Sequence, residues 1–305
     1  MDWVAEFDRR VLECPRTIKI VSEEPMHRHT SFHIGGPAKR MAFPSDTGEL
    51  AFLLHLGQDC GAQPLVIGNG TNLLVSDEGL DRLVIETSNV NLLESGAEPN
   101  DVTAACGVPL ARLADFACKH GLSGLEFAHG IPGTVGGAVC MNAGAYGGEM
   151  KQVLIGASVL FPGEKPQFLW VEDLNLGYRH SLLTEHPEAV VLAANFRLTP
   201  GNPEEIREKM RDLMQRRKTS QPLEWPSAGS TFKRPEGHFA GTLIDQCGLK
   251  GLTVGGAQVS EKHAGFIINC GNATCADVQE LIRQVQERVL TETGVRLEPE
   301  VRIVH

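Results

Sequence analysis

The chain has 305 residues, with 28 Lys or Arg against 38 Asp or Glu, so its formal net charge is −10. The length suggests about two domains of ~150 residues each. A composition of 42% apolar and 22% charged residues is that of an ordinary soluble globular protein. The acidic balance argues against a nucleic-acid-binding protein, and no apolar run approaches the ~18 residues of a membrane span.

The cysteines, the histidines and the N-terminal residues exclude further classes of protein. The eight cysteines include no C-x-x-C pair, which in a chain of this size predicts reduced thiols in a cytosolic protein. The N-terminus carries acids from Asp2 onward and lacks an apolar core, so we expect no signal peptide. The 11 histidines are dispersed and H-E-x-x-H is absent, so we expect no metal site.

Hydrophobic periodicity and turn residues predict the elements in chain order. The first third is predicted to contain a helix over 2–14, a strand over 40–43, a helix from an Asp46/Glu49 capping box to Gly57, and strands over 64–67, 72–77 and 82–87. The middle is predicted to contain a strand over 101–106, a helix from Pro109 to His120, a glycine-rich loop over 129–148, and strands near 152–161 and 189–198.

The pattern breaks at Pro200-Gly201-Asn202-Pro203, and we place a domain boundary there. Beyond it we predict a charged helix over 204–218, a mixed block, a helix over 274–293 and a strand over 295–304. Strands and helices do not alternate regularly, which favours an α+β fold over a doubly wound sheet.

Glycine marks two candidate ligand loops. Gly68-Asn69-Gly70 follows a predicted strand, where glycine lets backbone N–H groups approach a phosphate, but Asn-Gly is also a leading hairpin signal. Taken alone, this segment favours a hairpin turn. The seven glycines of residues 129–148 are interleaved with apolar side chains, unlike a polar linker, and therefore favour a ligand-binding loop.

Charged residues mark two further candidates. The window 211–234 has six basic and two acidic residues, a local +4 that suggests an anionic ligand, although a solvated helix face explains part of it. Near the C-terminus, alternation places Glu298 and Glu300 on one strand face, where a solvent-exposed acid is the ordinary interpretation. No G-x-S-x-G nucleophile elbow is present.

Six motifs together resemble the UDP-N-acetylenolpyruvoylglucosamine reductase family. They are TSFHIGG (30–36), IGNGTNLLV (67–75), GIPGTVGGAVCMNAGAYG (130–147), GYRHS (177–181), AGSTFKRP (228–235) and LEPEVR (297–302). Each motif is weak alone, but six in order are specific. A strand follows GYRHS directly and Arg234 stands where a longer subtype has Asn, so the chain resembles the shorter subtype, which lacks a Tyr-bearing insertion over the substrate.

The resemblance implies an α+β fold with a vanillyl-alcohol-oxidase-type (PCMH-like) FAD module and a C-terminal substrate domain. The implied domains are residues 1–87 with strand 299–305, residues 88–200, and residues 201–298. It also implies a cytoplasmic enzyme of peptidoglycan synthesis, hence of cell-wall growth, cell shape and division. FAD would carry a hydride from NADPH to the enolpyruvyl group of UDP-N-acetylglucosamine enolpyruvate. We expect a monomer or weak oligomer.

The resemblance assigns roles to individual residues. Arg179 would stabilise developing negative charge, Ser230 would donate a proton, and Glu300 would hydrogen-bond the enediolate. Substrate binding falls to Tyr178, Lys218, Lys233 and Arg234. FAD binding falls to Gly68, Asn69, Gly70, Thr71, Asn72, Gly130, Ile131, Pro132, Gly133, Gly136, Gly137, Ala138, Asn142, Gly144, Ala145 and Tyr146.

Two other functions remain open at this stage. One is an O₂-using flavin oxidase on the same cofactor fold, which the basic window argues against because it favours a diphosphate substrate. The other is a non-catalytic nucleotide-sugar-binding protein, which would be colourless when purified. Without the motifs, Arg179 would be read as a structural ion pair, Ser230 as a turn residue and Glu300 as a solvated acid.

Overall fold

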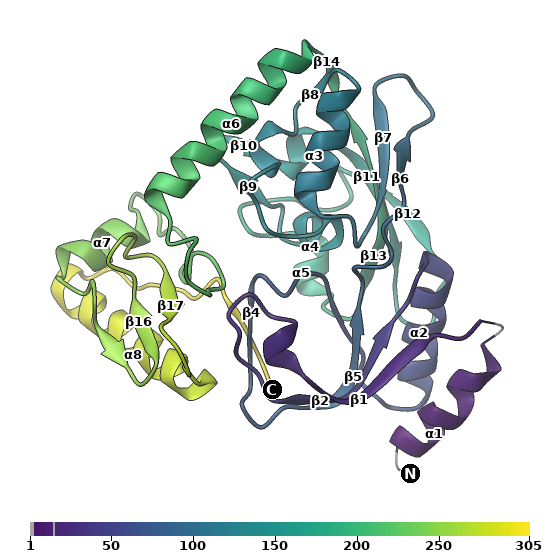
Figure 1. Ribbon diagram of the computed structural model, residues 1–305, viewed down its shortest axis with the longest axis horizontal. Helices are drawn as coiled ribbons and strands as arrows, with labels where there is room; N and C mark the ends of the chain where they lie inside the picture. The colour runs from purple at the N-terminus through teal and green to yellow at the C-terminus, as the bar shows by residue number, and fades with distance from the viewer. Residues whose placement is uncertain (1–2, 15) are drawn as a thin grey trace. The chain divides into compact units, whose positions relative to one another are not determined.

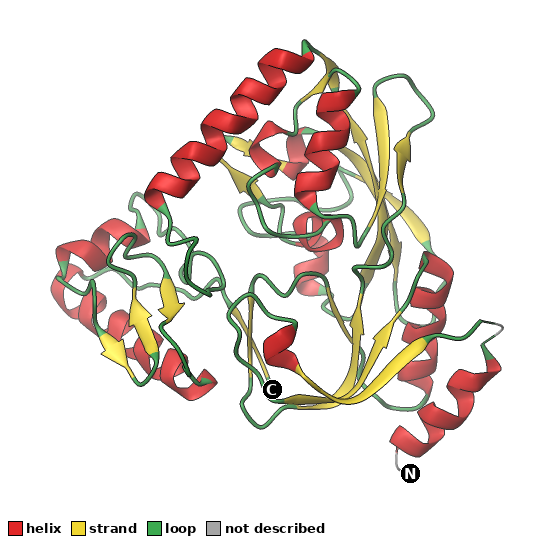
Figure 2. Cartoon of the chain, viewed as in Figure 1, coloured by secondary structure: helices red, strands yellow, loops and turns green. Residues whose placement is uncertain are grey.

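A computed structural model describes residues 3–14 and 16–305 (Figures 1 and 2). The chain forms two compact units. Unit 1 comprises Met1–Ser22, Lys39–Asn69 and Asp81–Gln215, and unit 2 comprises Glu23–Ala38, Gly70–Leu80 and Arg216–His305. Each unit has its own hydrophobic core. The division into three domains expected from the sequence stays a prediction.

The helices vary from one turn to five. The α-helices are α1 (Trp3–Arg10), α2 (Thr47–Asp59), α3 (Leu110–Lys119), α4 (Val135–Cys140), α5 (Leu182–Glu185), α6 (Pro203–Ser220), α7 (Ala240–Gln246) and α8 (Cys275–Thr293). Short 3₁₀ turns are η1 (Val11–Glu13), η2 (Met26–Arg28), η3 (Glu126–Ala128) and η4 (Met150–Gln152). None of the helices in the described ranges is long and apolar enough to cross a membrane.

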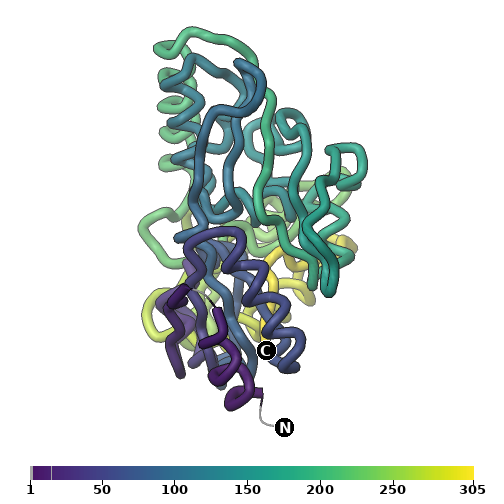
Figure 3. The backbone as a smooth tube through the Cα atoms, turned by 90° about the vertical axis from the view of Figure 1, so that its right-hand side faces the viewer, coloured from purple at the N-terminus to yellow at the C-terminus, as the bar shows by residue number. Residues whose placement is uncertain are grey.

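The strands form two larger sheets and several small ones. A four-stranded sheet has the order β1 (Lys19–Pro25), β2 (Pro37–Phe43), β5 (Leu80–Glu86), β3 (Leu65–Ile67). A five-stranded antiparallel sheet has the order β12 (Gln167–Trp170), β11 (Leu154–Leu160), β13 (Val190–Arg197), β7 (Asp101–Ala105), β6 (Leu93–Ser95). In the backbone tube of Figure 3, the strands of this five-stranded sheet run side by side.

The remaining strands are short. Unit 2 holds the antiparallel sheet β15 (Thr253–Val254), β16 (Ala257–Val259), β17 (Ile267–Asn269) and the parallel pair β18 (Arg302–Val304), β4 (Leu73–Val75). Unit 1 holds the pairs β10 (Gly148–Glu149), β9 (Gly144–Ala145) and β14 (Thr199–Pro200), β8 (Leu122–Ser123). Mixed parallel and antiparallel pairing confirms the expected α+β class.

Side-chain caps fix where the predicted helices begin. The Thr274 hydroxyl accepts the Asp277 N–H at 3.0 Å, and the Asp277 carboxylate accepts the Thr274 N–H at 3.0 Å, so α8 opens on the predicted residue. At α2, Asp46 accepts the Glu49 N–H at 2.8 Å. The Glu49 carboxylate instead binds Ser45, so only half of that expected capping box forms.

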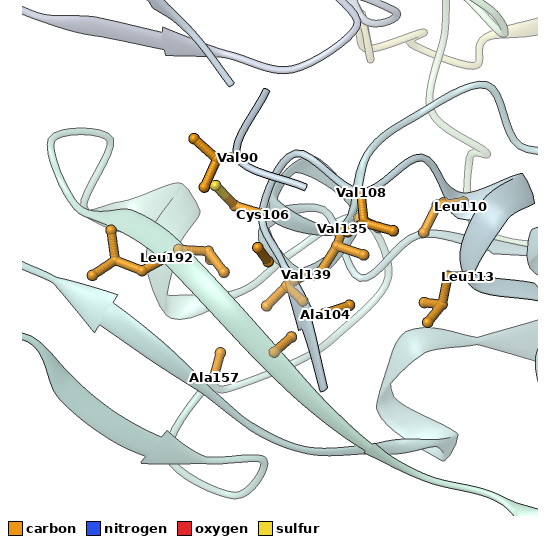
Figure 4. Packing of buried hydrophobic residues seen from close by; sticks show 14 of the residues in the cluster. Val90, Ala104, Cys106, Val108, Leu110, Leu113, Val135, Val139, Ala157 and Leu192 are labelled. Carbon is orange, nitrogen blue, oxygen red and sulfur yellow. The ribbon is translucent and has the colours of Figure 1, made fainter. Parts of the chain in front are cut away.

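The core of unit 1 explains why apolar residues are interleaved with the glycines of residues 129–148. Val135 and Val139 of α4 are fully buried and lie beside Ala104 of β7 (Figure 4). The segment 129–148, expected as a loop, therefore contains a short helix that anchors it to the five-stranded sheet. This packing fixes the position of the glycine-rich turns on either side of α4.

Two strand predictions are wrong. The Asn-Gly sequence at 69–70 does not close a hairpin, because β3 pairs in parallel with β5 while β4 pairs in parallel with β18. The C-terminal strand covers only 302–304, because the preceding residues form backbone contacts with another segment and Pro299 interrupts the strand. Strand β12 was not predicted, and its residues Phe168 and Trp170 are exposed.

Other expectations fall close to the observed elements. The helix expected over 2–14 is α1 followed by η1, with Asp2 outside the described residues. Pro109 is the residue that precedes α3 rather than its first residue. None of the eight cysteines, all of which lie in the described ranges, is paired in a disulfide.

Candidate active site

Two of the predicted cofactor segments meet within unit 1. The Asn69 side-chain amide donates to the Pro132 carbonyl at 3.1 Å. A Cβ added to Gly68 would lie only 2.2 Å from the Thr134 hydroxyl oxygen, so this position admits no side chain. The turn after β3 and the loop before α4 are therefore held together by a hydrogen bond and by a contact that requires glycine.

These loops present backbone donors. Within the described residues, no hydrogen bond engages the N–H groups of Gly68, Asn69, Gly130 or Gly133. Around Gly137, on α4, a Cβ would meet no atom within 4 Å, so open space borders the helix. Unengaged N–H groups beside open space are what a phosphate ester recruits. The segment fits the pyrophosphate of a dinucleotide such as FAD.

The second half of the glycine-rich segment forms a tight hairpin. Strands β9 and β10 pair through Ala145 and Gly148, and the two residues between them, Tyr146 and Gly147, have φ of 54° and 86°. Positive φ at both central residues is the signature of a two-residue type I′ turn. The Tyr146 ring, a predicted cofactor contact, is 45% exposed at the tip of this hairpin.

Arg179 lies against that hairpin. Its guanidinium Nη2 is 3.5 Å from the Gly144 carbonyl, and its Cζ lies 5.3 Å from the centre of the Tyr178 ring. The residue stands in a four-residue turn in which the Gly177 N–H donates to the His180 carbonyl at 3.0 Å. The structure thus brings the predicted catalytic arginine to the predicted cofactor segment, 35 residues away in sequence.

The segments that carry Ser230 and Glu300 are hydrogen-bonded to each other within unit 2. The Glu300 N–H donates to the Thr231 carbonyl at 2.8 Å, and the Lys233 N–H donates to the Glu298 carbonyl at 2.8 Å. On its other side, Ser230 forms a β-bridge with Phe266. Residues 230–233 therefore run between the segment of Glu300 and the segment of Phe266. Ser230 is exposed and Glu300 is half-buried. Sequence spacing gave no sign of this convergence.

Asn72 binds the backbone of the same C-terminal segment at Glu300 and Arg302. Its side-chain amide donates to the Glu300 carbonyl at 3.1 Å, and its own carbonyl accepts the Arg302 N–H at 2.9 Å. Asn72, expected to bind the cofactor, has a side chain that holds the backbone of Glu300. Gly70 has φ of 59°, and a Cβ there would lie 2.1 Å from the His29 carbonyl oxygen, so the preceding turn also requires glycine.

The predicted substrate cations have local partners or lie exposed. The Lys233 ammonium is 3.5 Å from the Glu298 carboxylate, and the Arg234 guanidinium lies 3.9 Å above the Phe239 ring. Lys218 is exposed near the C-terminal end of α6. The local fold of unit 2 accounts for the positions of Lys233 and Arg234 without a ligand.

Sequence reasoning missed His263. Its Nδ1 accepts the Gly265 N–H at 3.1 Å, and its ring meets Phe266 edge-on with centroids 5.0 Å apart. Burial, with a smaller contribution from Lys250, lowers the pKa of His263. Gly265 in turn accepts the Thr231 N–H at 2.8 Å, so His263 supports the strand that carries Ser230. A lone histidine outside the matched motifs offered no signal.

Unit 2 also contains an open groove of about 670 Å³ that holds none of the predicted site residues. Two of its polar side chains already have partners. The Asp77 carboxylate accepts the Cys275 and Ala276 N–H groups at 2.9 and 3.3 Å, and the Asn269 amide donates to the Phe32 carbonyl at 3.0 Å. We assign no ligand to this groove.

Comparison with known proteins places the chain among characterised families. Residues 221–304 match the family described as UDP-N-acetylenolpyruvoylglucosamine reductase, C-terminal domain, and residues 38–165 match the family described as FAD binding domain. A UDP-N-acetylenolpyruvoylglucosamine reductase from Agathobacter rectalis is 48% identical, with 98% of each chain covered.

Solved structures give the same result for the fold. A UDP-N-acetylenolpyruvylglucosamine reductase from Thermus caldophilus superposes with a TM-score of 0.79 at 37% identity, covering 95% of this chain and 99% of that one. An alkyldihydroxyacetonephosphate synthase superposes with a TM-score of 0.50 at 14% identity over 64% of this chain and 40% of that one, a likeness of fold alone. The expected fold class is confirmed.

Proposed function

This chain belongs to the UDP-N-acetylenolpyruvoylglucosamine reductase family, and we propose that it reduces the enolpyruvyl group of UDP-N-acetylglucosamine enolpyruvate to give UDP-N-acetylmuramate. The reductant is NADPH and the cofactor is FAD. The product serves peptidoglycan synthesis in the cytoplasm. The observation that carries the proposal is the position of Arg179, 3.5 Å from Gly144 of the segment that fits a flavin dinucleotide.

Bound FAD would accept a hydride from NADPH and pass it to the vinyl carbon of the substrate. The N–H groups of Gly68, Asn69, Gly130 and Gly133 would hold the cofactor's pyrophosphate, since they have no other partner among the described residues. The open side of α4 at Gly137 leaves room for a bulky group close to the backbone. Glycine is required for this arrangement because a Cβ would occupy the same space.

Arg179 would stabilise the negative charge that develops on the substrate carboxylate and the neighbouring carbon as hydride arrives. A guanidinium held by a backbone carbonyl and an aromatic ring has a fixed direction before the reaction begins. Preorganised charge of this kind commonly contributes the largest part of a rate enhancement. We assign Arg179 of unit 1 to this role.

Ser230 and Glu300 of unit 2 would complete the reaction. Ser230 would donate a proton to the carbon next to the carboxylate, and its exposure leaves the hydroxyl accessible. Glu300, tied by its N–H to the Thr231 carbonyl, would hydrogen-bond the enediolate in its protonated form. Lys218, Lys233, Arg234 and Tyr178 would bind the anionic substrate.

Anaerobic spectroscopy of the purified protein tests this assignment. NADPH should bleach the flavin absorbance band, and the enolpyruvyl sugar should restore it without oxygen. Ser230→Ala should still bleach but should lose product formation by roughly 10²-fold or more. Ser227→Ala is the matched control, because the hydrogen bonds of Ser227 with Ser31 use its backbone. A colourless protein, or reoxidation by air with no response to the sugar, would refute the proposal.

A further inference from the structure

Asn142 is the most completely hydrogen-bonded side chain of the glycine-rich segment. It is 1% exposed, and its amide donates one hydrogen to the Glu149 carboxylate at 3.1 Å and the other to the Gly177 carbonyl at 2.9 Å. Its Oδ1 accepts the Lys151 N–H at 2.9 Å. An amide has two N–H hydrogens, so no donor remains for a ligand.

The Gly177 bond reaches the turn that carries Arg179. Arg179 has φ of 54°, a left-handed conformation that a non-glycine residue adopts at a cost, so contacts from outside the turn must hold it. Two further bonds join the same segments: the Lys151 ammonium donates to the Leu176 carbonyl at 3.1 Å, and the Ser181 hydroxyl donates to the Cys140 carbonyl at 2.6 Å.

The Asn142 side chain differs from those of Lys151 and Ser181 because it binds two segments at once, the cofactor hairpin through Glu149 and the Arg179 turn through Gly177. Glu149 lies on β10, which pairs with the β9 strand whose Gly144 carbonyl faces Arg179. Glu149 and the Gly177 carbonyl are both acceptors, so the residue between them must supply two donors. Asparagine does this, and its left-handed backbone, with φ of 42°, suits Asn better than most residues.

We propose that Asn142 is a positioning residue for Arg179, tying the Arg179 turn to the cofactor hairpin, and that its side chain does not contact the cofactor. This inference rests on the proposed function. It predicts that changes at Asn142 act on the step that Arg179 serves, the transfer to the enolpyruvyl sugar. Cofactor content and reduction of the flavin by NADPH should be retained.

Asn142→Asp is the sharpest perturbation, because it keeps the size and the Lys151 acceptor, removes both amide donors and sets a second carboxylate beside that of Glu149. We expect product formation per bound flavin to fall about 10²-fold, the loss typical of a catalytic group displaced by about 1 Å. Glu149→Gln alone is the reference for the double variant described next, since the glutamine oxygen can still accept from Asn142.

The double variant Asn142→Asp/Glu149→Gln separates positioning from general stability. The glutamine amide introduced at position 149 would now donate to the carboxylate introduced at position 142, which restores that contact and with it the melting temperature. The Gly177 carbonyl keeps only the His180 N–H of its own turn and still lacks the donor from Asn142, so product formation should remain low. If the double variant recovers product formation together with melting temperature, Asn142 has only a structural role and the proposal is wrong.

Other outcomes of these experiments are also decisive. Unchanged product formation in Asn142→Asp overturns the proposal, as does loss of FAD with an unaltered rate per bound flavin, which would make the amide a cofactor contact. Should Asn142→Asp not fold, Asn142→Gly keeps the left-handed backbone and should show the same selective loss. If the unaltered protein itself forms no product, the proposed function has failed, whatever the variants do.

Discussion

The contact between Gly68 and Thr134 gives a prediction that can be worked from the structure. In Gly68→Ala the new Cβ would lie 2.2 Å from Thr134 Oγ1, about 1.2 Å short of the 3.4 Å at which ordinary contact begins. Thr134 is 2% exposed, so its side chain has no free space to enter. The loop that carries Gly130 and Gly133 must therefore move.

Overpacking of this kind costs about 1–3 kcal/mol. For a unit of this size each kcal/mol lowers the melting temperature by about 2–4 °C, so we expect a fall of roughly 2–12 °C without cofactor. If the moved loop also misplaces the N–H groups of Gly68 and Gly130, the same energy weakens FAD binding by roughly 5- to 150-fold. Melting curves and flavin titration of the deflavinated protein measure both.

A second substitution tests the cause. In Gly68→Ala/Thr134→Ala the hydroxyl and methyl are gone and the nearest remaining Thr134 atom is its Cβ, at 3.2 Å. The Thr134 side chain makes no capping hydrogen bond to α4, so Thr134→Ala alone should cost little beyond its buried methyl. The double variant should regain most of the lost stability and FAD affinity. If it binds FAD as weakly as Gly68→Ala, or if Gly68→Ala matches the unaltered protein, the argument from this contact is refuted.

Three further predictions each concern a single residue. Gly137→Ala should raise the melting temperature without FAD, because alanine favours a helix by up to about 1 kcal/mol and meets no atom, yet it should weaken FAD binding; unchanged binding would remove Gly137 from the site. Burial lowers the pKa of His263, so its contribution to stability is full above the ordinary value of 6.5 and is lost as the pH falls towards the lowered one. Melting temperatures of His263→Gln should lack that acid dependence. Asp77→Ala should cost about 1–2 kcal/mol in urea unfolding, since two N–H groups at the start of α8 lose their acceptor.

Elements whose signals are local were predicted well from the sequence. The helix predicted over 274–293 is α8, and the residues that cap its start, Thr274 and Asp277, are three residues apart in the same helix. The Asn69-Gly70 hairpin failed for the opposite reason. Both strands that flank it take parallel partners, and the partner of β4 lies at the far end of the chain, over 302–304.

The candidate site divides in the same way. The motifs identified Arg179, Ser230 and Glu300 through family resemblance. No spacing rule places the segment that carries Ser230 beside that of Glu300, because the pairing joins irregular segments without a strand pattern. The hydrogen bond from Asn142 to Gly177 could not be predicted from the sequence either. Asparagine in a glycine-rich loop looks like a turn residue, and its partner is a carbonyl oxygen that every residue has.

The parallel pairing of β4 with β18 also orders events during synthesis. Residues 73–75 leave the ribosome early, yet their strand partner, residues 302–304, is made only after unit 1 is complete at residue 215. Asn72 likewise waits for the Glu300 carbonyl. The segment that carries Ser230 therefore acquires its neighbour only after residue 300 has been synthesised. Unit 1 can begin to fold once residue 215 has been made, whereas the acid–base half of the proposed enzyme waits for residues 300–304, so a nascent chain that has not reached them lacks half of the proposed site.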